Sequence, residues 1–64
     1  MDFKMFESVY QSHIATMGPL EKEKHRKENI VKIEKDLNHD CINVYFQKDG
    51  WSEWYRYYPN GTWG

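Results

Sequence analysis

The chain has 64 residues and a formal net charge of −1, from nine basic and ten acidic side chains. A chain of this length forms one domain over residues 1–64 and buries only about 60% of the surface that its unfolded form exposes, so we expect a stability of roughly 3–5 kcal/mol. The near-neutral charge argues against a function that depends on neutralising many phosphates, and the single cysteine excludes an internal disulfide. The chain lacks both the run of ~20 apolar residues that spans a bilayer and the apolar core of a secretion signal, which predicts a cytoplasmic protein without membrane contact.

The first segment predicts an amphipathic helix. Its large apolar side chains recur at spacings of three and four, which places them on one helical face: Phe3, Phe6, Tyr10, Ile14 and Met17. Asp2 is the candidate N-cap. Gly18 could end the helix in a left-handed conformation, and Pro19 cannot continue it.

The middle of the chain allows two structures. Residues 20–29 are highly charged with mixed signs, and Pro19 suits the first turn of a charged second helix. Over residues 30–37 the Lys and Glu content favours continuing that helix, which we expect. The β-branched side chains of Ile30, Val31 and Ile33 favour instead a strand that pairs with the next segment through a turn at residues 38–40.

Residues 41–64 hold eight of the eleven aromatic side chains. Ile42, Val44 and Phe46 alternate along one face of a predicted strand, and Asp49-Gly50 is a strong signal for a two-residue hairpin turn into a return strand over residues 51–58. The expected class is α+β, with an N-terminal amphipathic helix, a charged second helix and a small antiparallel sheet built on this aromatic hairpin. The sheet would have two or three strands, or three to four if residues 30–37 are a strand.

No pattern in the sequence predicts catalysis. The chain has no phosphate-binding Gly-rich loop and no nucleophile elbow. His39, Asp40 and Cys41 are possible ligand types, but a structural zinc site needs four ligands, and neighbours on a strand point to opposite faces. We therefore expect a protein that is not an enzyme and that has no metal site and no cofactor.

The aromatic hairpin predicts a binding surface, because eleven rings exceed what so small a core needs. Trp, Tyr and Arg dominate binding hot spots, since they bury a large area with few rotatable bonds. The predicted partner-binding residues are Trp51, Trp54, Tyr55, Arg56, Tyr58 and Trp63, with Trp54, Arg56 and Tyr58 on the outer side of the hairpin. We expect a non-enzymatic interaction protein, such as a regulator, an inhibitor or a phage-type accessory protein, that binds a protein partner or a second copy of itself.

The alternative is single-stranded nucleic-acid binding. Exposed rings can stack on bases of any sequence, and four nearby basic residues could contact phosphates: Lys22, Lys24, Arg26 and Lys27. Because Glu21, Glu23 and Glu28 offset most of this charge, a solvated helix face is the competing interpretation of the same residues.

Overall fold

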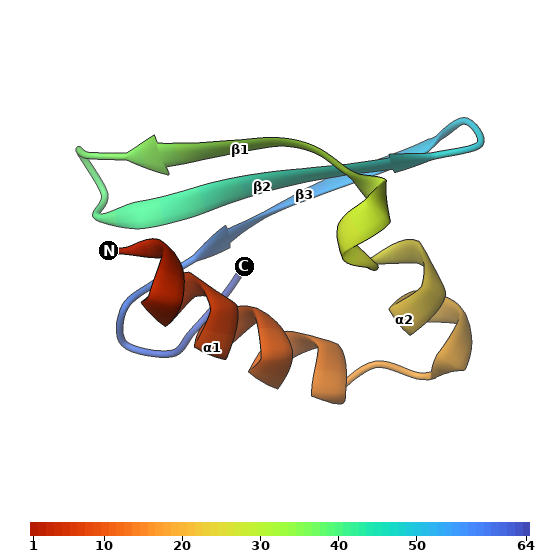
Figure 1. The fold of residues 1–64 in the computed structure, drawn as a ribbon, viewed down its shortest axis with the longest axis horizontal. Coiled ribbons are helices and arrows are strands. Elements are labelled where there is room, and N and C mark those ends of the chain that lie inside the picture. Colours follow the sequence, from red (N-terminus) through yellow and green to blue (C-terminus); the bar gives the residue numbers. More distant parts are fainter.

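The computed structural model describes residues 1–64. Its elements in chain order are α1 (Phe3–Ala15), α2 (Pro19–Lys24), a 3₁₀ turn η1 (Lys27–Asn29), β1 (Ile30–Asp36), β2 (Cys41–Lys48) and β3 (Trp51–Tyr57). The strands form one antiparallel sheet in the order β1-β2-β3, and both helices lie on the same side of it (Figure 1). The predicted α+β class is confirmed. No helix has both the length and the apolar character needed to cross a membrane.

The boundaries of α1 follow from its capping residues. The Met5 amide donates to the Asp2 carboxylate at 2.8 Å, which makes Asp2 the predicted N-cap. The helix ends at Ala15, and the expectation that Gly18 would close it in a left-handed conformation is wrong. Gly18 has φ −74° and is the N-cap of α2, with Pro19 in the first turn, where its missing amide hydrogen carries no cost.

The buried face of α1 is rotated from the predicted stripe. Phe6, Val9, Tyr10 and His13 are buried, whereas Phe3 is 52% exposed. Phe3 lies in the first turn of the helix, where the Lys35 ammonium of β1 lies 4.8 Å from its ring centre and leaves the residue about half exposed. These α1 residues and the β2 residues that the sequence predicts as their partners share one core, which consists of Phe6, Val9, Tyr10, Ile42, Val44, Phe46 and Tyr57.

Residues 30–36 form a strand, so the expected continuation of the second helix through this segment is wrong. The α2 helix stops at Lys24 because the Asn29 side-chain amide donates to the Glu23 and Lys24 carbonyls, at 3.1 and 3.0 Å, and thereby satisfies groups at the helix end. Downstream, the Asp36 carboxylate accepts from two backbone amides of the following turn. These local hydrogen bonds favour the strand alternative, and the sheet has three members.

The second hairpin has the predicted turn. Asp49 and Gly50 both have positive φ, at 48° and 82°, as a two-residue hairpin loop requires. The loop sets the register of β2 against β3, in which Val44 lies opposite Tyr55 and Tyr45 lies opposite Trp54. After β3 the chain turns at Gly61, and Gly64 exchanges two backbone hydrogen bonds with Arg56 at the β3 edge.

Candidate interaction surface

The face of the sheet that points away from the helices, called the outer face below, is left uncovered by any other element. Two rows of side chains cross it because the strands are in register. Lys32, Tyr45 and Trp54 form one row, with one residue from each strand. In the next row, Glu34 lies opposite Asn43, which lies opposite Arg56.

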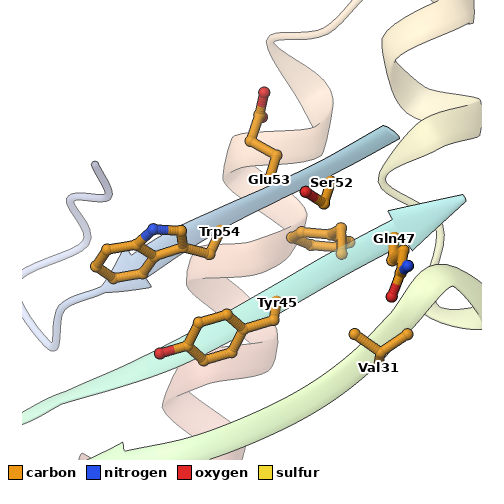
Figure 2. A pocket seen from close by; sticks show the side chains of 7 residues that line it. Val31, Tyr45, Gln47, Ser52, Glu53 and Trp54 are labelled. Carbon is orange, nitrogen blue, oxygen red and sulfur yellow. The ribbon is translucent and has the colours of Figure 1, made fainter. Parts of the chain in front are cut away.

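Tyr45 and Trp54 form a stacked ring pair at the centre of this face. Their ring centroids are 5.6 Å apart and their planes differ by 18°. The Lys32 ammonium lies 5.4 Å from the centre of the Tyr45 ring, and the Arg56 guanidinium lies 5.3 Å from the Trp54 ring. The result is a ladder, defined as Lys32, Tyr45, Trp54 and Arg56, in which each outer ring face meets a cation. Figure 2 shows the two rings side by side on β2 and β3.

Glu34 of the second row makes one hydrogen bond and one ion pair to the ladder. The Tyr45 hydroxyl donates to the Glu34 carboxylate at 2.9 Å, and Lys32 lies 3.4 Å from the same carboxylate. The hydrogen bond from Tyr45, followed by one from Asn43, lowers the pKa of Glu34. The carboxylate is ionised at neutral pH and orients the Tyr45 ring through this hydrogen bond.

A shallow hollow of about 260 Å³ lies beside the rings. The side chains labelled around it in Figure 2 are Val31, Tyr45, Gln47, Ser52, Glu53 and Trp54. It forms because β1 contains an irregularity between Ile30 and Lys32, which leaves Val31 unpaired and exposed next to β2. Trp54, at 48% exposure, forms the opposite wall. An apolar side chain could lie between Val31 and Trp54.

Arg56 contributes a charge that the chain does not neutralise. The other arginine, Arg26, and four of the seven lysines pair with a carboxylate within 4 Å, but Arg56 forms no such pair. Its buried Nε has no hydrogen-bond partner. A buried donor without a partner costs about 1–3 kcal/mol. The outer face thus combines an exposed indole ring with a cation that lacks an acceptor.

The structure divides the predicted partner-binding residues between two faces. Trp54 and Arg56 lie on the outer face, and Tyr58 follows β3 in half-buried form. Trp51, Tyr55 and Trp63 instead pack against the core on the helix side.

Histidines account for the position of these three rings. Trp63 stacks on the His13 ring with centroids 4.9 Å apart, and Tyr55 meets the same ring edge-on at 4.6 Å. Trp51 contacts His25 in the same manner at 5.1 Å.

The sequence alone did not identify Tyr45 and Lys32 as residues of the outer face. Tyr45 could have been found, because a two-residue loop at Asp49-Gly50 pairs position 45 with position 54.

The predicted basic residues lie away from the outer face, on the segment that includes α2 and η1. Lys24 pairs with Glu21 at 3.8 Å, Arg26 with Glu28 at 2.7 Å, and Lys27 with Glu7 at 2.6 Å. Figure 1 shows that this segment is on the helix side of the sheet. The structure therefore does not join the basic residues and Trp54 into one surface.

A buried polar cluster on the helix side links the helices to β3. His25 Nδ1 donates to the Glu21 carbonyl at 2.7 Å, and its Nε2 lies 2.9 Å from the Glu53 carboxylate. His13 Nδ1 and the Tyr57 hydroxyl are hydrogen-bonded at 2.8 Å. Burial, reinforced by the nearby His25, lowers the pKa of His13. Neither histidine lines any of the surface hollows.

No group of three or more His, Cys, Asp or Glu side chains is placed to hold a metal ion. Cys41 is buried, and burial raises the pKa of its thiol.

No protein-family model, curated protein or solved structure matches the chain.

Proposed function

We propose that this chain is a small non-enzymatic protein-binding module that works in the cytoplasm, where it regulates or inhibits a partner protein. The partner binds the outer face of the sheet. One observation carries the proposal: the stacked Tyr45–Trp54 pair lies on that face with Trp54 48% exposed, although the core on the opposite face already holds several rings.

The energetics of binding support this use of the rings. Trp and Tyr add a large contact area with only two side-chain torsions each, so they lose little entropy when a partner covers them. Here the loss is smaller still, because Glu34 and the two cations already fix the ring orientations. A fixed, exposed ring pair is more typical of a binding hot spot than of a solvated surface.

The chemistry of the outer face describes the partner segment. An apolar side chain would occupy the hollow between Val31 and Trp54. A carboxylate two strand positions along would meet Arg56, whose charge has no acceptor in this chain. Desolvated charge pairs of this kind add specificity as well as affinity. We therefore expect the partner to present an apolar residue close to an Asp or Glu.

The test is capture of a partner from lysate of the native host, with the folded protein as bait. Trp54→Ala removes the ring that forms one wall of the hollow, and we expect it to reduce recovery of the specific partner at least tenfold, as for a hot spot worth about 2 kcal/mol or more. Leu37→Ala is the matched control, because Leu37 is 89% exposed but lies in the β1–β2 turn. Wild-type and Leu37→Ala baits should recover the same protein.

Replacement of Ser52 by a photoreactive cross-linking residue tests directly whether the partner contacts the outer face. Ser52 is exposed and borders the hollow, so a cross-linker there should attach to the captured protein. The same cross-linker at Gln11, exposed on α1, should not. Equal recovery by the wild-type and Trp54→Ala baits, or cross-linking only from position 11, would remove the proposal.

Single-stranded nucleic acid is a second candidate partner, since two cations flank the ring pair and a base that displaced one of them would stack on the freed ring face. It predicts quenching of Trp fluorescence by oligothymidylate at low salt, loss of this quenching in Trp54→Ala, and weaker binding as salt rises. The basic residues of α2 and η1 would add little, because most are paired with carboxylates. An unchanged fluorescence spectrum at low salt would exclude this candidate.

A further inference from the structure

β1 is an open edge of the sheet. It pairs with β2 on one side and with nothing on the other, whereas the chain end covers part of the β3 edge through the Arg56–Gly64 hydrogen bonds. Half of the β1 backbone groups therefore point away from the sheet, where another strand could bind them. In Figure 1 this edge runs along the top of the molecule.

We propose that this edge pairs with the β1 edge of a second copy of the chain. The two strands run antiparallel, Ile33 lies opposite Ile33 of the second copy, and the two-fold axis passes between them perpendicular to the sheet. The two three-stranded sheets then become one continuous sheet, with all helices on the same side. This interface shares Lys32 with the outer-face ladder, but it forms along the β1 edge and does not depend on the function proposed above.

The charges on β1 select a second copy as the occupant. With Ile33 at the two-fold axis, Lys32 of each chain lies opposite Glu34 of the other. Both residues lie on the outer face, so two opposite-charge cross-strand pairs form across the interface. Opposite charges directly across a strand pair are stabilising, and like charges are destabilising.

The neighbouring symmetric registers lack this match. A pairing centred on Lys32 sets Lys32 against itself, and one centred on Glu34 sets two carboxylates against each other. A pairing centred on Lys35 opposes two ammonium groups and sets Glu34 against Asp36. A strand that is self-complementary in one register only is a feature of specific homodimers, because the register is then unique.

Apolar side chains near the axis add to the interface. Ile33 is 41% exposed at the edge, and a groove of about 430 Å³ opens beside it on the helix side. Phe3, Phe6 and Ile30 supply the rest of the apolar lining of this groove. In the dimer, the Ile33 side chains of the two copies contact each other at the axis, and each one lines the groove of its own copy.

Charge reversal tests the pairing. We expect sedimentation equilibrium of the wild-type protein to show a monomer–dimer equilibrium that weakens as salt rises. Lys32→Glu and Glu34→Lys should each weaken the dimer about tenfold or more, because each turns two attractive pairs into two repulsive ones. The double variant, with both substitutions in one chain, should restore the dimer.

Mixing the two single variants separates pairing between chains from effects within a chain. Lys32→Glu chains carry two acidic groups at these positions and Glu34→Lys chains two basic groups, so a 1:1 mixture should form a heterodimer although each variant alone is monomeric. Circular dichroism checks that each variant is folded. If one does not fold, Ile33→Lys replaces it, since this change sets two ammonium groups against each other at the axis and should abolish the dimer.

Two outcomes would overturn the inference: a wild-type protein that stays monomeric at millimolar concentration, or a dimer unaffected by the charge reversals and by Ile33→Lys. Trp54→Ala is the control that separates this inference from the proposed function. It should leave the dimer intact while it removes partner capture, so either proposal can fail without the other.

Discussion

At the scale of single residues, the buried polar side chains work in pairs. His13 is matched by the Tyr57 hydroxyl, and His25 by Glu53 and the Glu21 carbonyl. Buried polar groups that are fully hydrogen-bonded specify one packing arrangement, whereas an orphaned group is costly. These pairs therefore fix how the helices sit on β3.

Tyr57→Phe tests the first pair. The substitution keeps the ring in the core but leaves His13 Nδ1 without its partner in a buried site. We expect a loss of about 1–3 kcal/mol in the free energy of unfolding, measured by urea denaturation. Tyr58→Phe, at a half-buried position with no side-chain hydrogen bond, should change it by less than about 0.5 kcal/mol. Equal effects of the two changes would contradict this role of the hydroxyl.

The pH dependence of stability follows from the same cluster. His13 faces His25, Glu53, Tyr55 and Tyr57, and burial lowers its pKa from the ordinary value of 6.5. Below that value the unfolded chain binds a proton that the folded chain resists. Stability from His13 is therefore complete above pH 6.5 and declines as the pH falls from there toward the folded-state pKa.

Glu53 adds to the loss of stability at acid pH, and Tyr55 causes a loss of stability at alkaline pH. Burial acts to raise the pKa of Glu53, but hydrogen bonds from Tyr55 and His25 outweigh burial and lower the pKa below its ordinary value of 4.5. The stability that ionised Glu53 contributes is therefore lost as the pH falls below 4.5. Burial and Glu53 raise the pKa of Tyr55 to about 12, so the stability that Tyr55 contributes is lost as the pH rises from 10 toward that value.

The urea concentration at the unfolding midpoint should decrease as the pH is lowered from 8 to 4, and His13→Gln should make this decrease smaller near pH 6. An unchanged slope would contradict the assignment.

At the scale of elements, turns and caps decide what each segment becomes. The Asn29 amide ends α2, the Asp36 carboxylate organises the β1–β2 turn, and Asp49-Gly50 sets the register that brings Tyr45 beside Trp54. A change of one residue in the second hairpin loop would move every β3 side chain to the other face. The outer-face ladder thus depends on a two-residue turn.

Gly50→Ala tests that turn. Gly50 has φ 82°, a region that costs a residue with a Cβ about 1–2 kcal/mol, and open space around it removes any steric contribution. We expect a decrease of that size in the free energy of unfolding, with an unchanged denaturant slope. Gly18→Ser is the control, because Gly18 is an N-cap with negative φ and a serine there should stabilise by a few tenths of a kcal/mol. A neutral Gly50→Ala would contradict the argument.

At the scale of the molecule, the fold is two layers around a core of seven side chains. The sheet is buried on the face that the helices cover and open on the other. Such a core supplies only about 3–5 kcal/mol in a chain of this size. The protein has little stability to spare for a core defect, and a partner or a second copy would add to it by mass action.

Substitutions at Ile42 test this margin. Ile42 is fully buried at the centre of the sheet. Ile42→Val should cost about 0.5–1.5 kcal/mol and leave a cooperative unfolding transition, whereas Ile42→Ala should cost about 2–5 kcal/mol and leave much of the protein unfolded at room temperature. Near-ultraviolet circular dichroism, which reports the packing of the rings, distinguishes the two. A folded Ile42→Ala protein with a wild-type midpoint would show that the core is larger than seven residues.

Local patterns in the sequence determined α1 and its Asp2 cap, the hairpin turn at Asp49-Gly50, the alternation that buries Ile42, Val44 and Phe46, and the α+β class. Each depends on residues within a few positions of one another, so periodicity and turn chemistry suffice.

Only the tertiary structure decided the state of residues 30–36, the splitting of the predicted aromatic set, and the joining of Lys32, Tyr45, Trp54 and Arg56 into one ladder. The physical reason is that these features rest on contacts between distant segments. A β-branched, charged segment is close to balanced between helix and strand until β2 offers it hydrogen bonds, and a ring is hidden or exposed according to which face the helices cover.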